Sequence, residues 1–153
     1  MKRTYPLFVV LFFVCCNTSV HNSPGNAAGS EAGEVPAQRT RVDPNPIKTY
    51  SETVKSFETT DEFKVSLFET KNTFRYLIKI QYKQMEQEDT LRIPNFGVQP
   101  SVEIIKGDIR PSCVIGFFDQ EKKFRESKLI YFEDDKLKVK VLKHYAVYQS
   151  NGE

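Results

Sequence analysis

The sequence has no tryptophan, few cysteines and glycines, and no apolar run long enough to span a membrane. Its 153 residues include three Cys and seven Gly. The apolar stretch near the N-terminus, counted generously from Tyr5 to Cys16, covers twelve residues. A membrane-spanning helix needs about 20. The sequence therefore predicts no transmembrane helix.

The sequence also lacks an excess of charge of one sign. It carries 22 basic and 20 acidic residues, a formal net charge of +2. Two of the basic residues, Lys2 and Arg3, precede the apolar stretch, so the rest of the chain holds 20 of each sign, interleaved. A basic surface is what nucleic-acid binding requires. We therefore predict no nucleic-acid partner.

No pattern of catalytic or ligand-binding residues stands out. Gly107 and Gly116 are isolated, so no phosphate-binding glycine loop is present. The acidic run 133-EDD-135 lacks the spacing of a calcium loop and is predicted to form a solvated hairpin turn between two strands. Cys113 and His144 are the one cysteine and one histidine of the C-terminal two thirds. A thiol nucleophile needs a base within hydrogen-bond reach, and the apolar neighbours of Cys113 favour burial instead. We predict no enzymatic activity, no cofactor and no metal site.

The N-terminus has the layout of an export signal. Lys2 and Arg3 are followed by an apolar run from Leu7 to Val14, as in secretory signal peptides. The run ends in 13-FVCC-16, which resembles the lipobox of bacterial lipoproteins, in which a small residue precedes a cysteine that receives a diacylglyceryl group. The resemblance covers about the first 17 residues, and Phe13 departs from the leucine usual at that position.

The resemblance implies a location. Residues 1–15 would be removed as signal peptide, and Cys16 would carry at least two acyl chains, enough for stable anchoring. Asn17 is not the Asp that retains lipoproteins of enteric bacteria in the inner membrane, which favours the outer membrane, on its periplasmic side. The alternative is a soluble periplasmic or secreted protein cut near Cys16.

Residues 16–47 are predicted to form the lipidated cysteine and a flexible tether. The segment is rich in Gly, Pro and Ser and contains no aromatic residue. Such a composition buries too little apolar surface to offset the entropy of ordering it. As a flexible coil it spans roughly 30 Å. We therefore expect the folded domain to stand a short distance from the membrane.

Residues 48–150 are predicted to form an all-β domain. In 74-FRYLIKIQYK-83 apolar and polar residues alternate, which is typical of a half-buried strand. About seven such strands, separated by turn residues, predict an antiparallel two-sheet sandwich, of which the immunoglobulin-like arrangement is one form. A small open β-barrel is the alternative. Segments 50–58 and 84–89 remain ambiguous between strand and helix.

The C-terminal strand, predicted over 136–148, contains the candidate contact residues. Lys136, Lys138, Lys140 and Lys143 form a stripe that fits either contact with an anionic partner or protection of an exposed strand edge. His144, Tyr145 and Tyr148 are the other candidates for a partner or ligand contact.

Two functions remain open. We expect a non-enzymatic interaction or accessory module, lipid-anchored at a bacterial cell envelope, whose partner is another envelope protein. The alternative is a periplasmic domain that binds a small ligand or a glycan between its sheets.

Overall fold

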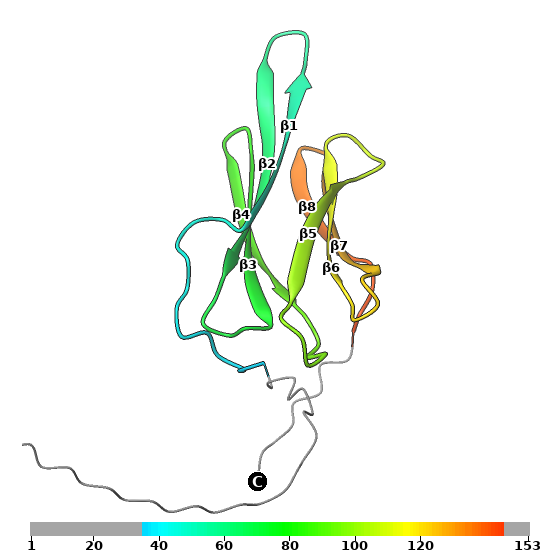
Figure 1. Ribbon diagram of the computed structural model, residues 1–153. Helices are drawn as coiled ribbons and strands as arrows, with labels where there is room; N and C mark the ends of the chain where they lie inside the picture. The colour runs from blue at the N-terminus through cyan, green and yellow to red at the C-terminus, as the bar shows by residue number, and fades with distance from the viewer. Residues whose placement is uncertain (1–34, 146–153) are drawn as a thin grey trace, which may run out of the picture. The chain divides into compact units, whose positions relative to one another are not determined.

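The structure, a computed structural model, describes residues 35–145 (Figure 1). Cys16 and Tyr148 lie outside this range, as does the predicted signal peptide. No helix occurs within the described range. The eight strands are β1 (Lys48–Lys55), β2 (Thr60–Glu69), β3 (Arg75–Tyr82), β4 (Met85–Arg92), β5 (Ser101–Lys106), β6 (Ser112–Phe118), β7 (Phe124–Glu133) and β8 (Lys136–Val141).

The strands form two antiparallel four-stranded sheets. The first sheet has the order β1-β2-β3-β4 and the second sheet the order β5-β6-β7-β8. The predicted all-β two-sheet sandwich is confirmed, with eight strands where about seven were expected. Each strand pairs with its neighbours in sequence, whereas immunoglobulin domains have Greek-key connections. The two sheets stay separate, so the alternative open barrel does not form.

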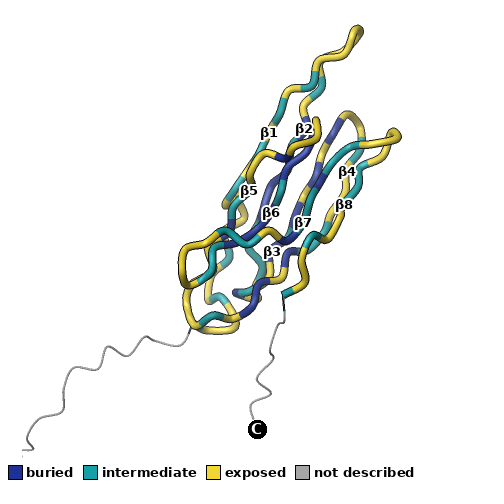
Figure 2. Tube along the Cα trace, turned by 90° about the vertical axis from the view of Figure 1, so that its right-hand side faces the viewer, coloured by how far each residue is buried: buried dark blue, intermediate teal, exposed yellow. Residues whose placement is uncertain are grey.

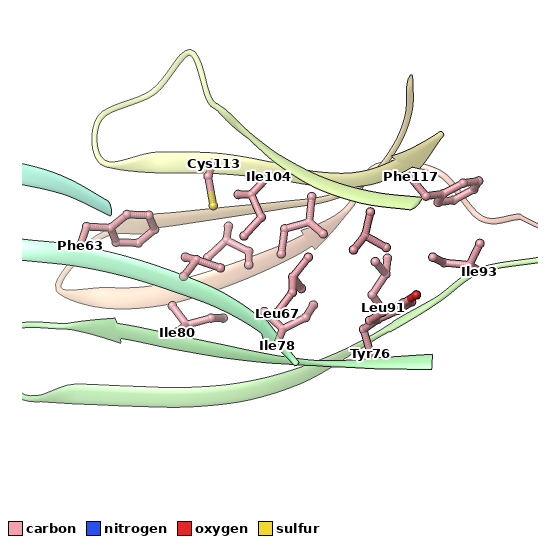
Figure 3. Close-up of a cluster of buried hydrophobic side chains, with 14 of the residues drawn as sticks. Phe63, Leu67, Tyr76, Ile78, Ile80, Leu91, Ile93, Ile104, Cys113 and Phe117 are labelled. Atoms are coloured by element: carbon pink, nitrogen blue, oxygen red, sulfur yellow. The ribbon is translucent and has the colours of Figure 1, made fainter. Parts of the chain in front are cut away.

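The core lies between the facing surfaces of the two sheets. On β3 the predicted alternation buries Tyr76, Ile78, Ile80 and Tyr82, while Arg75, Lys79 and Gln81 stay exposed. Figure 3 shows side chains of the first sheet meeting those of β5 and β6, including Cys113 and Phe117. Each fully buried aliphatic or aromatic side chain contributes about 1.5–3 kcal/mol, so the core holds the sandwich together without a disulfide among residues 35–145.

The two ambiguous segments are both edge strands of the first sheet. Segment 50–58 falls mainly in β1, and segment 84–89 falls mainly in β4. The residues 84-QMEQED-89 favour a helix by propensity, but pairing with β3 overrides that preference. An edge strand tolerates charged side chains because one of its edges faces water.

The C-terminal strand is shorter than predicted. The prediction of a strand over 136–148 is wrong in extent, because β8 ends at Val141. The N–H of Leu142 instead donates to the carbonyl of Ser127, a residue of β7, at 2.8 Å. The register shift in the second sheet lies between Ile115 and Gly116, opposite Ser127.

The turn between β7 and β8 has the predicted hairpin form. Asp134 and Asp135 both have positive φ, 52° and 57°, between Glu133 and Lys136. Two left-handed residues in a two-residue loop match the twist of the adjoining strands. The acidic run is therefore a turn, as the sequence predicts.

Residues 36–39 of the predicted tether pack on the first sheet. The N–H of Arg39 donates to the carbonyl of Lys71, and the N–H of Thr73 donates to the carbonyl of Ala37. The guanidinium of Arg39 is buried against Tyr76, with 4.8 Å between its central carbon and the ring centroid. The folded part of the chain thus begins before Lys48.

Candidate functional site

The predicted contact residue Tyr145 serves mainly in packing. Its ring packs edge-on against Phe117, with 4.9 Å between centroids, and its hydroxyl donates to the carbonyl of Glu126 at 2.9 Å. Burial raises the pKa of Tyr145. His144, one residue earlier, is exposed beyond the end of β8. Tyr148 lies outside the described residues, so its part in the predicted contact stays a prediction.

The lysine stripe lies on an edge strand. β8 is the last strand of the second sheet, and Lys138 and Lys140 point to the outer face, because their neighbours Leu137 and Val139 pack on the core. The Lys138 ammonium donates to Glu133 at 2.8 Å and to Asp134 at 2.7 Å. These hydrogen bonds, that to Asp134 first, raise the pKa of Lys138. Lys140 is exposed. Lysines on an edge strand discourage pairing with a strand of another molecule, and the positions of Lys138 and Lys140 fit this role.

Cys113 and His144 do not form a thiol–imidazole pair. Cys113 is fully buried between the sheets, and burial raises the pKa of its thiol to about 12. His144 adjoins Tyr145, which contacts Phe117, four residues along β6 from Cys113. Four residues of strand span about 13 Å. The His144 imidazole therefore lies near the end of β6 that is opposite to Cys113.

The described range holds neither a cluster of metal ligands nor a membrane-spanning helix. Residues 35–145 contain no group of three or more His, Cys, Asp or Glu side chains that could hold a metal ion. Within that range no helix reaches the length and apolarity that crossing a bilayer demands.

The outer faces of the two sheets differ in polarity. On the second sheet three aliphatic side chains form one row across neighbouring strands: Ile105 on β5, Val114 on β6 and Leu129 on β7. Lys140 of β8 continues the row. The corresponding face of the first sheet carries mostly polar side chains, such as Thr49, Ser66, Lys79 and Glu88 in one row.

The β1–β2 hairpin extends past the β3–β4 hairpin beside it. β1 and β2 pair as far as Lys55 and Thr60, whereas the pairing of β2 with β3 begins at Phe63, opposite Tyr82. Residues 53–62 therefore form a two-stranded ribbon that projects beyond the β3–β4 turn, as Figure 1 shows at the top of the view. We call residues 53–62 the ribbon. A hairpin without a third strand is marginally stable in water.

The ribbon ends in a tight turn that presents Phe57. The N–H of Ser56 donates to the carbonyl of Thr59 at 2.9 Å, and the hydroxyls of the same two residues lie 3.0 Å apart. This network holds the turn closed without help from Phe57. The Phe57 side chain is fully exposed. The turn between β1 and β2 is coloured as exposed in Figure 2. A buried phenylalanine contributes about 1.5–3 kcal/mol, and in this chain Phe57 contributes none of that.

A step lies where the ribbon rises past the β3–β4 turn. One hollow at the step, of about 400 Å³, is lined among others by Glu62, Lys64 and Glu86. A second hollow, of about 580 Å³, is lined by Thr59, Asp61, Lys83, Gln84 and Met85. Both lie at the surface, whereas the buried side chains fill the space between the sheets (Figure 3).

Reasoning from the sequence missed the ribbon. One available indication was Phe57 itself, a single aromatic residue in the polar run 55-KSFETTDE-62. The projection depends on the relative lengths of two hairpins, which is set by strand pairing.

Comparisons with protein-family models, with curated proteins and with solved structures give no match to this chain.

Proposed function

We propose that this chain is a non-enzymatic interaction module of a bacterial cell envelope. Acyl chains on Cys16 hold it at the outer membrane, on the periplasmic side, and its partner is another envelope protein. The basic and apolar N-terminus and the lipobox-like 13-FVCC-16 support the anchor. The folded part supports a binding role rather than a chemical one, since Cys113 is buried and His144 lies near the other end of β6.

The observation that carries the proposal is the full exposure of Phe57 at the tip of the ribbon. Aromatic residues are enriched where protein interfaces form, because they bury a large area with few torsions to fix. Val54 at the base of the ribbon packs against the core of the sandwich, but the aromatic tip adds nothing to that core. Its features are those of an element that becomes buried when a partner binds.

Affinity capture from detergent-solubilised membranes tests the proposal. Tagged wild-type chain is compared with Phe57→Ser and with the matched control Ile109→Ser, which removes an apolar side chain exposed elsewhere in the described structure. We expect one envelope protein to co-purify with the wild type and with Ile109→Ser, and to fall at least about tenfold with Phe57→Ser, the loss typical of an interface anchor. Equal recovery with all three forms would contradict the binding role.

The anchor is tested separately. Cys16→Ala is expected to move the protein from the membrane fraction to the soluble fraction, and intact mass should show the wild type beginning at Cys16 with acyl chains attached. A mature chain without lipid would refute the proposed location.

A further inference from the structure

The hydrogen-bond alternation of the ribbon leaves backbone groups of β2 without a strand partner. The bond from Ser56 to Thr59 closes the turn, so the facing pairs alternate from there between bonded and non-bonded. Val54 and Asp61 form a bonded pair. Thr60 and Glu62 then direct their N–H and C=O groups away from β1, toward the edge where β3 does not reach.

The two hollows adjoin along this edge and share Asp61, Lys83, Gln84 and Met85. Asp61 shares a face with the buried Phe63, so Thr60 and Glu62 point to the outer face. The smaller hollow includes the outer-face side chains Glu62 and Glu86 together with the inner-face Asp61, whereas the larger hollow includes Asp61 without Glu62. An added strand directs successive side chains to opposite faces, so its outer-face side chains would enter the smaller hollow and its inner-face side chains the part that both hollows share.

The charge of the ribbon favours a basic occupant. Residues 53–62 carry three carboxylates, Glu58, Asp61 and Glu62, against one ammonium, Lys55. The hollows add Glu86, Lys64 and Lys83, so the four carboxylates of the edge exceed its three ammonium groups by one negative charge. A second copy of the same ribbon would set carboxylates against carboxylates, which disfavours self-association. An anionic membrane surface would be repelled for the same reason. Lysine or arginine side chains would meet Glu62 on one face and Asp61 on the other.

We infer that the free edge of β2 at Thr60 and Glu62 is a docking site for an extended, basic segment of a partner protein. The inference rests on the proposed function and names its mode of recognition. The segment pairs its backbone with β2 in the place that β3 leaves open, its side chains enter the two adjoining hollows, and Phe57 packs against the partner beyond the segment.

A random twelve-residue peptide library displayed on phage is the probe, selected against the mature chain in detergent. We expect enrichment of peptides with Lys or Arg at alternate positions. In titrations of the synthetic peptides, Glu62→Pro should weaken binding about tenfold or more, since proline removes a backbone donor needed for strand addition. This donor has no strand partner in the described structure, so β1–β2 pairing should survive.

Thr53→Pro is the matched control. Thr53 faces Glu62 in the same cross-strand pair, and its N–H points to the opposite edge of the ribbon. We expect peptide affinity within about twofold of the wild type. Glu62→Lys, which keeps the backbone donor and reverses the charge, should also weaken the basic peptides. Hydrogen exchange at the amides of Thr60 and Glu62 should slow when peptide is bound.

Several outcomes would overturn the inference: no enrichment, equal loss with Thr53→Pro and Glu62→Pro, or unchanged exchange at both amides. A dimer in sedimentation that Glu62→Pro abolishes would place a second copy on this edge instead. Selection needs neither acylation nor a cellular partner. Its failure alone would leave the role of Phe57 in membrane capture standing, and failed capture alone would leave the docking edge standing.

Discussion

Arg39 is expected to contribute far more stability than its position in the predicted tether suggests. Its side chain is 7 % exposed, and its Nε lies 3.0 Å from Glu69. The two terminal nitrogens donate to the carbonyls of Thr70, Asn72 and Thr73 at 2.7–2.9 Å. Arg39→Ala leaves the half-buried Glu69 carboxylate without its cationic partner and three carbonyls without their donors.

The magnitude follows from the burial of these acceptors. A hydrogen bond from a charged donor contributes about 1.5–3 kcal/mol net, and removing one partner of a buried pair is destabilising by about 3–5 kcal/mol. Asn72 is exposed and water can replace its lost donor. We therefore expect Arg39→Ala to lower the free energy of unfolding by about 2–4 kcal/mol. For a domain of this size that corresponds to roughly 10–20 °C in Tm.

Urea unfolding followed by circular dichroism measures the change, with Arg110→Ala as the control. Arg110 also pairs with a carboxylate, Glu52 at 3.2 Å, but its side chain is 72 % exposed. An exposed ion pair contributes about 0–1 kcal/mol. The loss in free energy of unfolding caused by Arg39→Lys should fall between the losses caused by Arg39→Ala and Arg110→Ala. Lysine keeps the positive charge but lacks the planar guanidinium group that donates to several carbonyls at once. Equal effects of Arg39→Ala and Arg110→Ala would refute the view that residues 36–39 belong to the folded domain.

Three further predictions concern the turn, the core and pH. Asp135→Gly should raise the free energy of unfolding by about 0.5–1 kcal/mol in the same urea assay, because glycine adopts the positive φ of 57° without strain; a destabilised variant would contradict the turn geometry. Cys113 should react with a thiol reagent only at the rate of unfolding, because burial raises the pKa of its thiol to about 12; fast labelling of the native protein, seen by absorbance, would contradict its burial. Burial acts to raise the pKa of Glu103, but hydrogen bonds from Lys48 and the Ile104 N–H outweigh it and hold that pKa below its ordinary value of 4.5. A lowered folded-state pKa means that the stabilisation is present above the unfolded value and is lost as pH falls through the folded one, so stability should drop on acidification below about pH 4.5. Glu103→Gln should flatten that drop, and an unchanged pH profile would count against the ion pair with Lys48.

The strands that the sequence predicts well are those whose two faces differ. In β3, apolar residues at every second position fit one buried face, and no other regular structure has that period. β1 and β4 carry polar residues at most positions because they are edge strands, so their local pattern holds little information. Their strand character comes from pairing with β2 and β3, which a local pattern does not show.

The candidate site was harder to predict for a related reason. Tyr145 was placed on a strand by extending the alternation of β8, but the strand ends at Val141 and the chain turns toward Ser127. The side chain then packs on Phe117. The projection of the ribbon depends on the position of the β3–β4 turn relative to Phe57. That position is set by the pairing register of β2 with β3, which a local sequence pattern does not show.

The outer edges of the two sheets are protected against the addition of a further strand, and the backbone at Thr60 and Glu62 is not. β1 and β5 lie beside each other and are joined by the ion pair of Lys48 with Glu103. β4 carries the inward-pointing Asp89, which pairs with Lys128 at 2.6 Å, and β8 carries the lysines. Paired charges and lysines of this kind discourage the addition of a further strand.

At the step, by contrast, the accessible backbone belongs to β2, a central strand of the first sheet that β3 covers only from Phe63 onward. Its Thr60 side chain is uncharged, and two adjoining hollows lie beside this backbone. A sheet whose true edges are protected, but whose central strand is left open beside an exposed phenylalanine, is organised to accept one strand at one place.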